Sequence, residues 1–245
     1  MKKVIDKASQ AVARYSYLRS VQKMASAGEF VIAHHGIQRS GTNYLLSCLD
    51  ALNVKVVNRL DPVGRHPAHK HFRWYGDKRF IPDFLSKKYS NSLHAITCEE
   101  LNYLARFPKN TKHIVIRKSV PGAICSLMNF GIRKKWFENK EDALGNYQVL
   151  LNDYTHYYQF WLRLAEISDQ VCVVDYEEIS KNSNKLVGAL NALGAELPLL
   201  HKNLQFDEVR MSPKTRKQIV TLDDVIDVSS DWEASRVSQV RSQTL

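Results

Sequence analysis

The sequence lacks the features of a membrane protein and of a disulfide-stabilised protein. It has four cysteines among 245 residues and no CxxC pair, and no apolar run approaches the roughly 18 residues that span a bilayer. Its first twenty residues lack the unbroken apolar core of a secretory signal. We therefore expect a cytoplasmic protein without a membrane span, in which the cysteines are buried thiols, at Cys48, Cys98, Cys125 and Cys172.

Acidic residues are scarce in the first part of the chain. Residues 1–150 carry 25 Lys and Arg against 11 Asp and Glu, whereas the remainder carries 10 against 14. Such a surface suits a polyanionic nucleotide, a nucleic acid, an acidic glycan or a membrane. The hydrophobic fraction of 44% is ordinary for a folded domain. Charge alone does not select the partner, so the motifs must decide.

Short apolar runs alternate with stretches of helical periodicity. The predicted helices are residues 44–49, a stretch ending at residue 130, and residues 143–167. The predicted strands are residues 30–33, 54–57, 113–116 and 171–174. This alternation is typical of the α/β class, with a parallel central sheet flanked by helices in a P-loop-like three-layer architecture. In such a sheet, ligands bind at the carboxyl ends of the strands.

One α/β domain is expected, over residues 30–229. Apolar positions at helical spacing predict an amphipathic helix within residues 1–29, which we expect to pack on the domain. The alternative is a helix that binds a membrane surface or a partner. Residues 230–245 are predicted to be a loosely held tail, and residues 59–82 a long surface loop of the kind that often carries function.

A glycine-bearing loop, GIQRSGTN at residues 36–43, joins the first strand to its helix. Its backbone N–H groups and the helix N-terminus can converge on an anion, although a purely steric turn would also explain the glycines. Thr42 stands where a P-loop triphosphatase places the Lys that reaches the β- and γ-phosphates, which weighs against ATP hydrolysis. Arg39 can supply positive charge instead, because a guanidinium binds oxyanions bidentately.

The run RSGTNYL resembles the 5′-phosphosulfate loop of sulfotransferases that use 3′-phosphoadenosine 5′-phosphosulfate (PAPS). The resemblance implies that the loop binds the phosphosulfate of this donor and that Arg39 also helps to neutralise the leaving phosphate. Gln38 departs from the family, which often has Pro there. The implied donor-binding residues of the loop are Arg39, Ser40, Gly41, Thr42 and Asn43.

Residues 113–130 are similar to the second signature of that family, a strand ending in a basic residue and a helix carrying a Ser. The resemblance implies that Arg117 and Ser126 hold the 3′-phosphate. The family spacing of eight positions fits Lys118, whereas Arg117 is nine positions from Ser126. Because alternation points Arg117 and Lys118 to opposite sides, only one should contact the phosphate, and we favour Arg117. Ser126 could instead bond only to its own helix.

The resemblance extends to a Lys-His element, HKHF at residues 69–72. It implies that His71 is the general base that deprotonates the acceptor, with Lys70 as a secondary charge stabiliser. From the residues alone, His71 could also be a solvated loop residue, or part of a metal site with His66 and His69. No fourth ligand of matching type is nearby, so no metal is expected.

The predicted reaction moves a sulfuryl group from PAPS to a hydroxyl or amine of an acceptor that the sequence does not identify. A carbohydrate and a small molecule are the acceptor classes considered. Aromatic residues of the 59–82 loop could line its pocket, whereas Tyr154, Tyr158 and Trp161 share one helix face and are expected in the core. One alternative is a nucleotide kinase or triphosphatase with Asp175 on magnesium. The other is a basic nucleic-acid-binding module, but no recognised motif supports a nucleic-acid partner.

Overall fold

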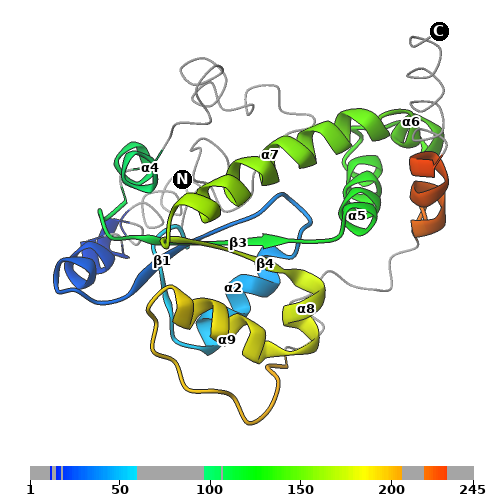
Figure 1. The fold of residues 1–245 in the computed structure, drawn as a ribbon. Coiled ribbons are helices and arrows are strands. Elements are labelled where there is room, and N and C mark those ends of the chain that lie inside the picture. The colour runs from blue at the N-terminus through cyan, green and yellow to red at the C-terminus, as the bar shows by residue number, and fades with distance from the viewer. Residues whose placement is uncertain are drawn as a thin grey trace, which may run out of the picture.

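The computed structural model describes residues 12, 15–17, 19–59, 97–105, 107–205 and 218–230, and these confirm the predicted α/β class. Their sheet has four parallel strands in the order β2-β1-β3-β4. Helices cover both faces, which gives three layers (Figure 1). The strands are β1 Val31–His35, β2 Lys55–Val56, β3 Lys112–Arg117 and β4 Val171–Asp175.

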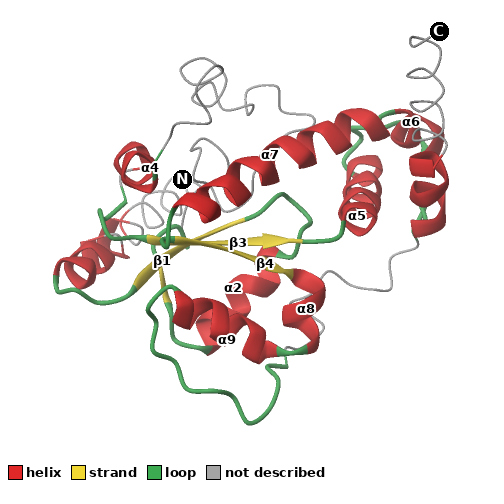
Figure 2. Ribbon diagram, in the orientation of Figure 1, coloured by secondary structure: helices red, strands yellow, loops and turns green. Residues whose placement is uncertain are grey.

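Two separate cores lie on the two faces of the sheet, because successive strand residues point to opposite sides. On β3, Ile114 and Ile116 pack with α2 and α9, whereas Val115 packs with α4 and α7. Figure 2 shows the strands between these two groups of helices. The labelled helices are α2 Thr42–Ala51, α4 Cys98–Ala105, α5 Val120–Arg133, α6 Lys140–Gly145, α7 Tyr147–Ile167, α8 Tyr176–Lys181 and α9 Ser183–Ala192.

The direction of strand addition changes between β1 and β3. β1 pairs with β2 on one side and with β3 on the other, and the loops after β1 and β3 leave from the same edge. In open α/β sheets such a switch point, outside the carboxyl ends of the strands, is where ligands bind. The predicted phosphate loop follows β1, and the predicted cations end β3, so both lie at this point.

A third core lies beyond the carboxyl end of β3, where α5, α6 and residues 218–230 pack together. Asn129 of α5 joins them, because its buried side chain accepts hydrogen bonds from the N–H groups of Ile219 and Val220, at 2.8 and 3.1 Å, and donates to the Val220 carbonyl at 2.7 Å. These contacts attach residues 219 and 220 to α5, the helix that carries Ser126.

The described part of the N-terminal region is helical through residue 26 and packs on the domain. Val21 and Ala25 are buried against Val31, Ala33 and Val57. Among the described residues no helix has the length and apolar character needed to cross a membrane. All four thiols are free; three are buried and the thiol of Cys172 is partly exposed.

Asp153 of α7 is a half-buried carboxyl group whose pKa is raised to about 7 by burial. The folded state therefore binds a proton between about pH 4 and pH 7 that the unfolded state has lost, and stability falls as the pH rises through this window. Asp153→Asn is expected to stabilise the protein by about 1–2 kcal/mol at pH 8, after allowance for solvent screening, and by nothing at pH 4. Urea denaturation at both pH values measures this.

The matched control is Glu166→Gln, which removes an exposed carboxylate from the same helix. It should leave the free energy of unfolding unchanged within about 0.5 kcal/mol at both pH values. Equal stabilisation by Asp153→Asn at pH 4 and pH 8 would contradict the assignment.

Candidate functional site

Residues 36–41 make a tight turn between β1 and α2, and this turn needs both of its glycines. Gly41 has a φ of 96°, and a Cβ at this position would lie 2.6 Å from Tyr176 Cδ2. A Cβ on Gly36 would lie 2.6 Å from Thr42 Cγ2. Ser40 is fully buried, and its N–H and Oγ both donate to the Ile37 carbonyl, at 3.0 and 2.8 Å. The Ser40 hydroxyl thus holds the turn together.

The loop presents the N-terminus of α2 to the carboxyl edge of the sheet. No side chain caps this terminus, and the first turn contains no acidic residue. The first N–H groups of a helix carry partial positive charge and favour an anion. Thr42 is buried and Asn43 is exposed, so the backbone N–H groups of the loop are the donors best placed for an anion.

Arg39 and Ser126, predicted from separate motifs, are in direct contact. Arg39 has a φ of 79°, and its Nε donates to Ser126 Oγ at 3.2 Å. Its guanidinium carbon also lies 5.8 Å from the ring centroid of Phe130, one helical turn beyond Ser126 on α5. Ser126 therefore bonds to a side chain of the loop and is not limited to the backbone of its own helix.

Arg117 is bound by an acidic residue of the neighbouring strand. It lies opposite Asp175 in the register of β3 and β4, and its Nε and Nη2 donate to the two carboxylate oxygens at 2.8 and 3.1 Å. This bidentate geometry is the strongest that an Arg and a carboxylate can form. The hydrogen bonds to Asp175 raise the pKa of Arg117. The guanidinium is thus fixed on β4.

Lys118, the next residue, points toward the loop. Its Nζ lies 5.7 Å from the ring centroid of Tyr176, the residue that abuts Gly41. Burial lowers the pKa of Lys118, and the charge of Arg39 lowers it further while that of Glu177 opposes this. Arg117 is the last residue of β3 and is bound by Asp175, whereas Lys118 lies beyond the end of the strand. Of the two cations, Lys118 is the one whose pKa the charge of Arg39 affects.

Three tyrosines of α7 lie against the end of β3 and the start of the loop after β1. Tyr154 donates to the carbonyl of Lys118, and Tyr158 donates to the carbonyl of Ile116 at 2.8 Å. Burial raises the pKa of Tyr157, and the nearby backbone of Gly36 opposes this rise. The prediction that Tyr154, Tyr158 and Trp161 are core residues is confirmed, since they are 6%, 2% and 2% exposed. The hydrogen bonds from Tyr154 and Tyr158 to the backbone at the end of β3 were not predicted, although buried tyrosine hydroxyls generally require a partner.

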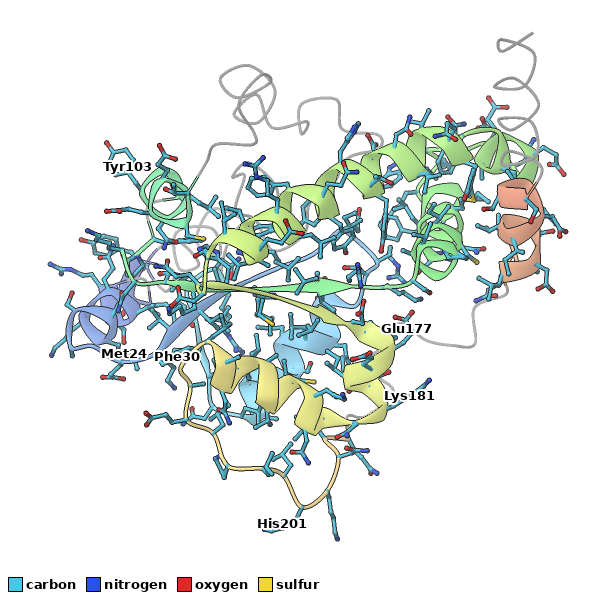
Figure 3. The ribbon with its side chains drawn as sticks, viewed as in Figure 1. Met24, Phe30, Tyr103, Glu177, Lys181 and His201 are labelled. Carbon is cyan, nitrogen blue, oxygen red and sulfur yellow. The ribbon has the colours of Figure 1, made fainter. Side chains whose placement is uncertain are left out.

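A carboxylate lies at the N-terminus of α5, at the same edge of the sheet. Glu177, labelled in Figure 3 at the start of α8, accepts from the backbone N–H of Ser119 at 3.1 Å and from its hydroxyl at 2.9 Å. Ser119 is the N-cap of α5. Glu177 thus places a carboxylate at the start of α5, and Glu177 and Glu178 lie in the first turn of α8, so the N-terminus of α2, which has no acidic residue in its first turn, is the best of the three for an external anion.

The predicted base lies outside the described residues. His71 and Lys70 fall between residues 60 and 96, as do His66 and His69, so the structure does not test their roles. In the described ranges no group of three His, Cys, Asp or Glu side chains is arranged to hold a metal ion. Comparison of the chain with protein-family models, with curated proteins and with solved structures finds no significant match.

Proposed function

We propose that this protein transfers a sulfuryl group from PAPS to an acceptor hydroxyl or amine. The observation that supports this most is the convergence of Arg39, Lys118 and Ser126 beside the uncapped N-terminus of α2. These groups come from both motifs that resemble the sulfotransferase family. Two cations, a hydroxyl donor and a helix N-terminus suit a ligand with several phosphate or sulfate oxyanions. We place the reaction in the cytoplasm, with a carbohydrate or a small molecule as acceptor.

The proposed chemistry is an in-line displacement at sulfur. The acceptor oxygen or nitrogen forms a bond to sulfur while the bond between sulfur and the 5′-phosphate oxygen breaks. The electron pair of that bond leaves with 3′-phosphoadenosine 5′-phosphate, and the acceptor proton passes to His71. Arg39 and the N–H groups of the loop neutralise the leaving phosphate, so catalysis rests on positioning and preorganised charge.

For the 3′-phosphate, the geometry favours Lys118 over Arg117. The Arg117 guanidinium already pairs Nε and Nη2 with Asp175, so its charge is partly neutralised and only the N–H groups not facing Asp175 remain for another anion. Lys118 is partly desolvated, lies near Arg39 and has the eight-residue spacing to Ser126. A partly buried cation binds an anion more strongly than an exposed one because solvent screening is weaker.

The kinase alternative gains no support from the described residues. Asp175, the residue that would hold magnesium, accepts both hydrogen bonds from Arg117, and Thr42 occupies the position of the phosphate-binding Lys. The alternative nevertheless makes a clear prediction of magnesium-dependent ATP binding. It therefore belongs in the same experiment.

Calorimetric titration with 3′-phosphoadenosine 5′-phosphate, beside ATP with magnesium, tests this proposal. The bisphosphate is expected to bind in the micromolar range and ATP at least about 10-fold more weakly. Lys118→Ala should weaken bisphosphate binding by about 10–100-fold, because a charge-assisted hydrogen bond is lost. Arg117→Ala should weaken it less than Lys118→Ala.

The thermal midpoint separates the two cations further. Arg117→Ala leaves Asp175 without its partner and should lower the midpoint, whereas Lys118→Ala should leave it unchanged or raise it, because a partly buried charge is removed. If Arg117→Ala abolishes binding and Lys118→Ala does not, Arg117 holds the phosphate. If ATP binds and the bisphosphate does not, the proposed function is wrong.

A further inference from the structure

Three buried polar side chains form a hydrogen-bonded chain beneath the phosphate loop. His35 of β1, His113 of β3 and Asn102 of α4 are each 0% exposed. His35 Nε2 lies 3.0 Å from His113 Nδ1, and His113 Nε2 lies 2.9 Å from Asn102 Oδ1. We call these three residues the imidazole relay. A core position filled by such groups is costly unless each hydrogen bond is made.

The hydrogen-bond partners determine which nitrogen carries each proton. Asn102 Nδ2 donates to the carbonyls of Lys109 and Thr111, at 3.1 and 3.0 Å, which leaves Oδ1 as an acceptor facing His113. His113 Nε2 must therefore carry a hydrogen. In a neutral ring its Nδ1 is then an acceptor, so His35 Nε2 is the donor. The relay runs in one direction, from His35 through His113 to Asn102.

The first member of the relay is attached to the phosphate loop. His35 immediately precedes Gly36, and its ring stacks on Trp161 of α7 with centroids 4.4 Å apart. One helical turn earlier on α7, Tyr157 lies close enough to Gly36 for the backbone of Gly36 to oppose the rise in its pKa that burial causes. The orientation of the His35 ring therefore affects the backbone at the junction of β1 and the loop.

The neighbouring histidine shows what a purely structural role would be. His34 is also 0% exposed, but it points to the other side of β1, where its Nδ1 and its backbone N–H both lie 3.1 Å from Asn58 Oδ1. Asn58 Nδ2 donates to the His34 carbonyl at 2.8 Å, so this amide extends the pairing of β1 beyond β2. His34 has the same residue type, strand and burial as His35, and its hydrogen bonds to Asn58 join β1 to the segment after β2.

We propose that the imidazole relay is a positioning device that sets the conformation of the phosphate loop for anion binding. His35, His113 and Asn102 are positioning residues and touch no ligand. The effect on nucleotide affinity rests on the proposed function, whereas the effect on the loop conformation does not. A relay of rigid rings with fixed tautomers holds the end of β1 in one orientation, which a flexible apolar side chain would not do.

His35→Phe tests the proposal, with His34→Phe as the matched control. Phe keeps a ring beside Trp161 and removes the donor to His113. Both variants lose one buried imidazole and should lower the thermal midpoint similarly. Only His35→Phe should weaken binding of 3′-phosphoadenosine 5′-phosphate, by about 10-fold or more, because the loop N–H groups no longer converge. Equal affinity losses in the two variants, or none in His35→Phe, overturn the proposal.

Nuclear magnetic resonance tests the relay without nucleotide binding and without dependence on the folding of the His35→Phe variant. In the ligand-free wild-type protein, ¹⁵N-labelled imidazoles should show His35 and His113 as neutral Nε2–H tautomers, and an Nδ1–H tautomer on His113 would overturn the relay. Asn102→Leu, on α4, should shift the Gly36 and Gly41 amide signals through the relay, whereas His34→Phe should not. Unshifted loop amides in Asn102→Leu also overturn it. Absence of nucleotide binding by the wild type alone would refute the proposed function and leave these readouts valid.

Discussion

Arg39→Ala is expected to reduce the rate of the proposed sulfuryl transfer by about 10²–10³-fold, the usual loss when one preorganised charge stabiliser is removed. Arg39 reaches from the loop to Ser126 and lies over Phe130, so its guanidinium has a fixed orientation before a ligand binds. In the proposed reaction, charge develops on the leaving phosphate in the transition state. The loss should therefore fall mainly on kcat, measured with PAPS and an acceptor found by screening.

Two further variants define what Arg39 contributes. Arg39→Lys retains the charge but not the planar guanidinium, and it should recover only part of the rate. Lys23→Ala removes the same net charge from an exposed position on the N-terminal helix and should leave kcat unchanged. A kcat for Arg39→Ala within 3-fold of the wild type would show that the loop does not stabilise the leaving group. A loss confined to KM would assign Arg39 to ground-state binding alone.

Stability should fall steeply in acid because of His113. Burial lowers the pKa of this imidazole from 6.5 to about 3. Between these values the unfolded chain binds a proton that the folded protein does not, so the free energy of unfolding decreases as the pH falls through this window. The full difference corresponds to roughly 5 kcal/mol. About 2 kcal/mol of it is expected to be lost between pH 7 and pH 5.

The measurement compares wild-type protein with His113→Gln by urea denaturation at pH 7 and pH 5. The variant is less stable at pH 7, and its deficit should shrink by about 2 kcal/mol at pH 5, because it lacks the titrating group. Asp153 titrates with the opposite sign over part of this range, so both proteins should carry Asp153→Asn. His156→Gln, at an exposed position on α7, is the control and should show no such change. A deficit that is constant with pH would contradict the neutral buried state of His113.

The strands and the helices that follow the first and third strands were predictable because their signals are local. Parallel strands buried on both faces are continuous apolar runs, and the helices after residues 41 and 119 have strong periodicity. The single helix predicted at residues 143–167 is interrupted at Asn146, where α6 ends and α7 begins. Helices α4, α8 and α9, which span six to ten residues each, were not predicted. Short helices are stabilised mainly by packing, which periodicity alone does not show.

The class of fold, the glycine-bearing turn after β1 and the cations of residues 39, 117 and 118 could be recognised from residues close together in the chain. The hydrogen-bond partner of each cation depends on the tertiary structure. Asp175, 58 residues after Arg117, binds that guanidinium through the register of β3 and β4, and the loop brings Arg39 to Ser126 across 87 residues. The relay of His35 and His113 likewise requires parallel pairing of distant strands. Spacing along the chain shows which side chains belong to one motif, whereas strand register and burial determine which distant residue each side chain contacts.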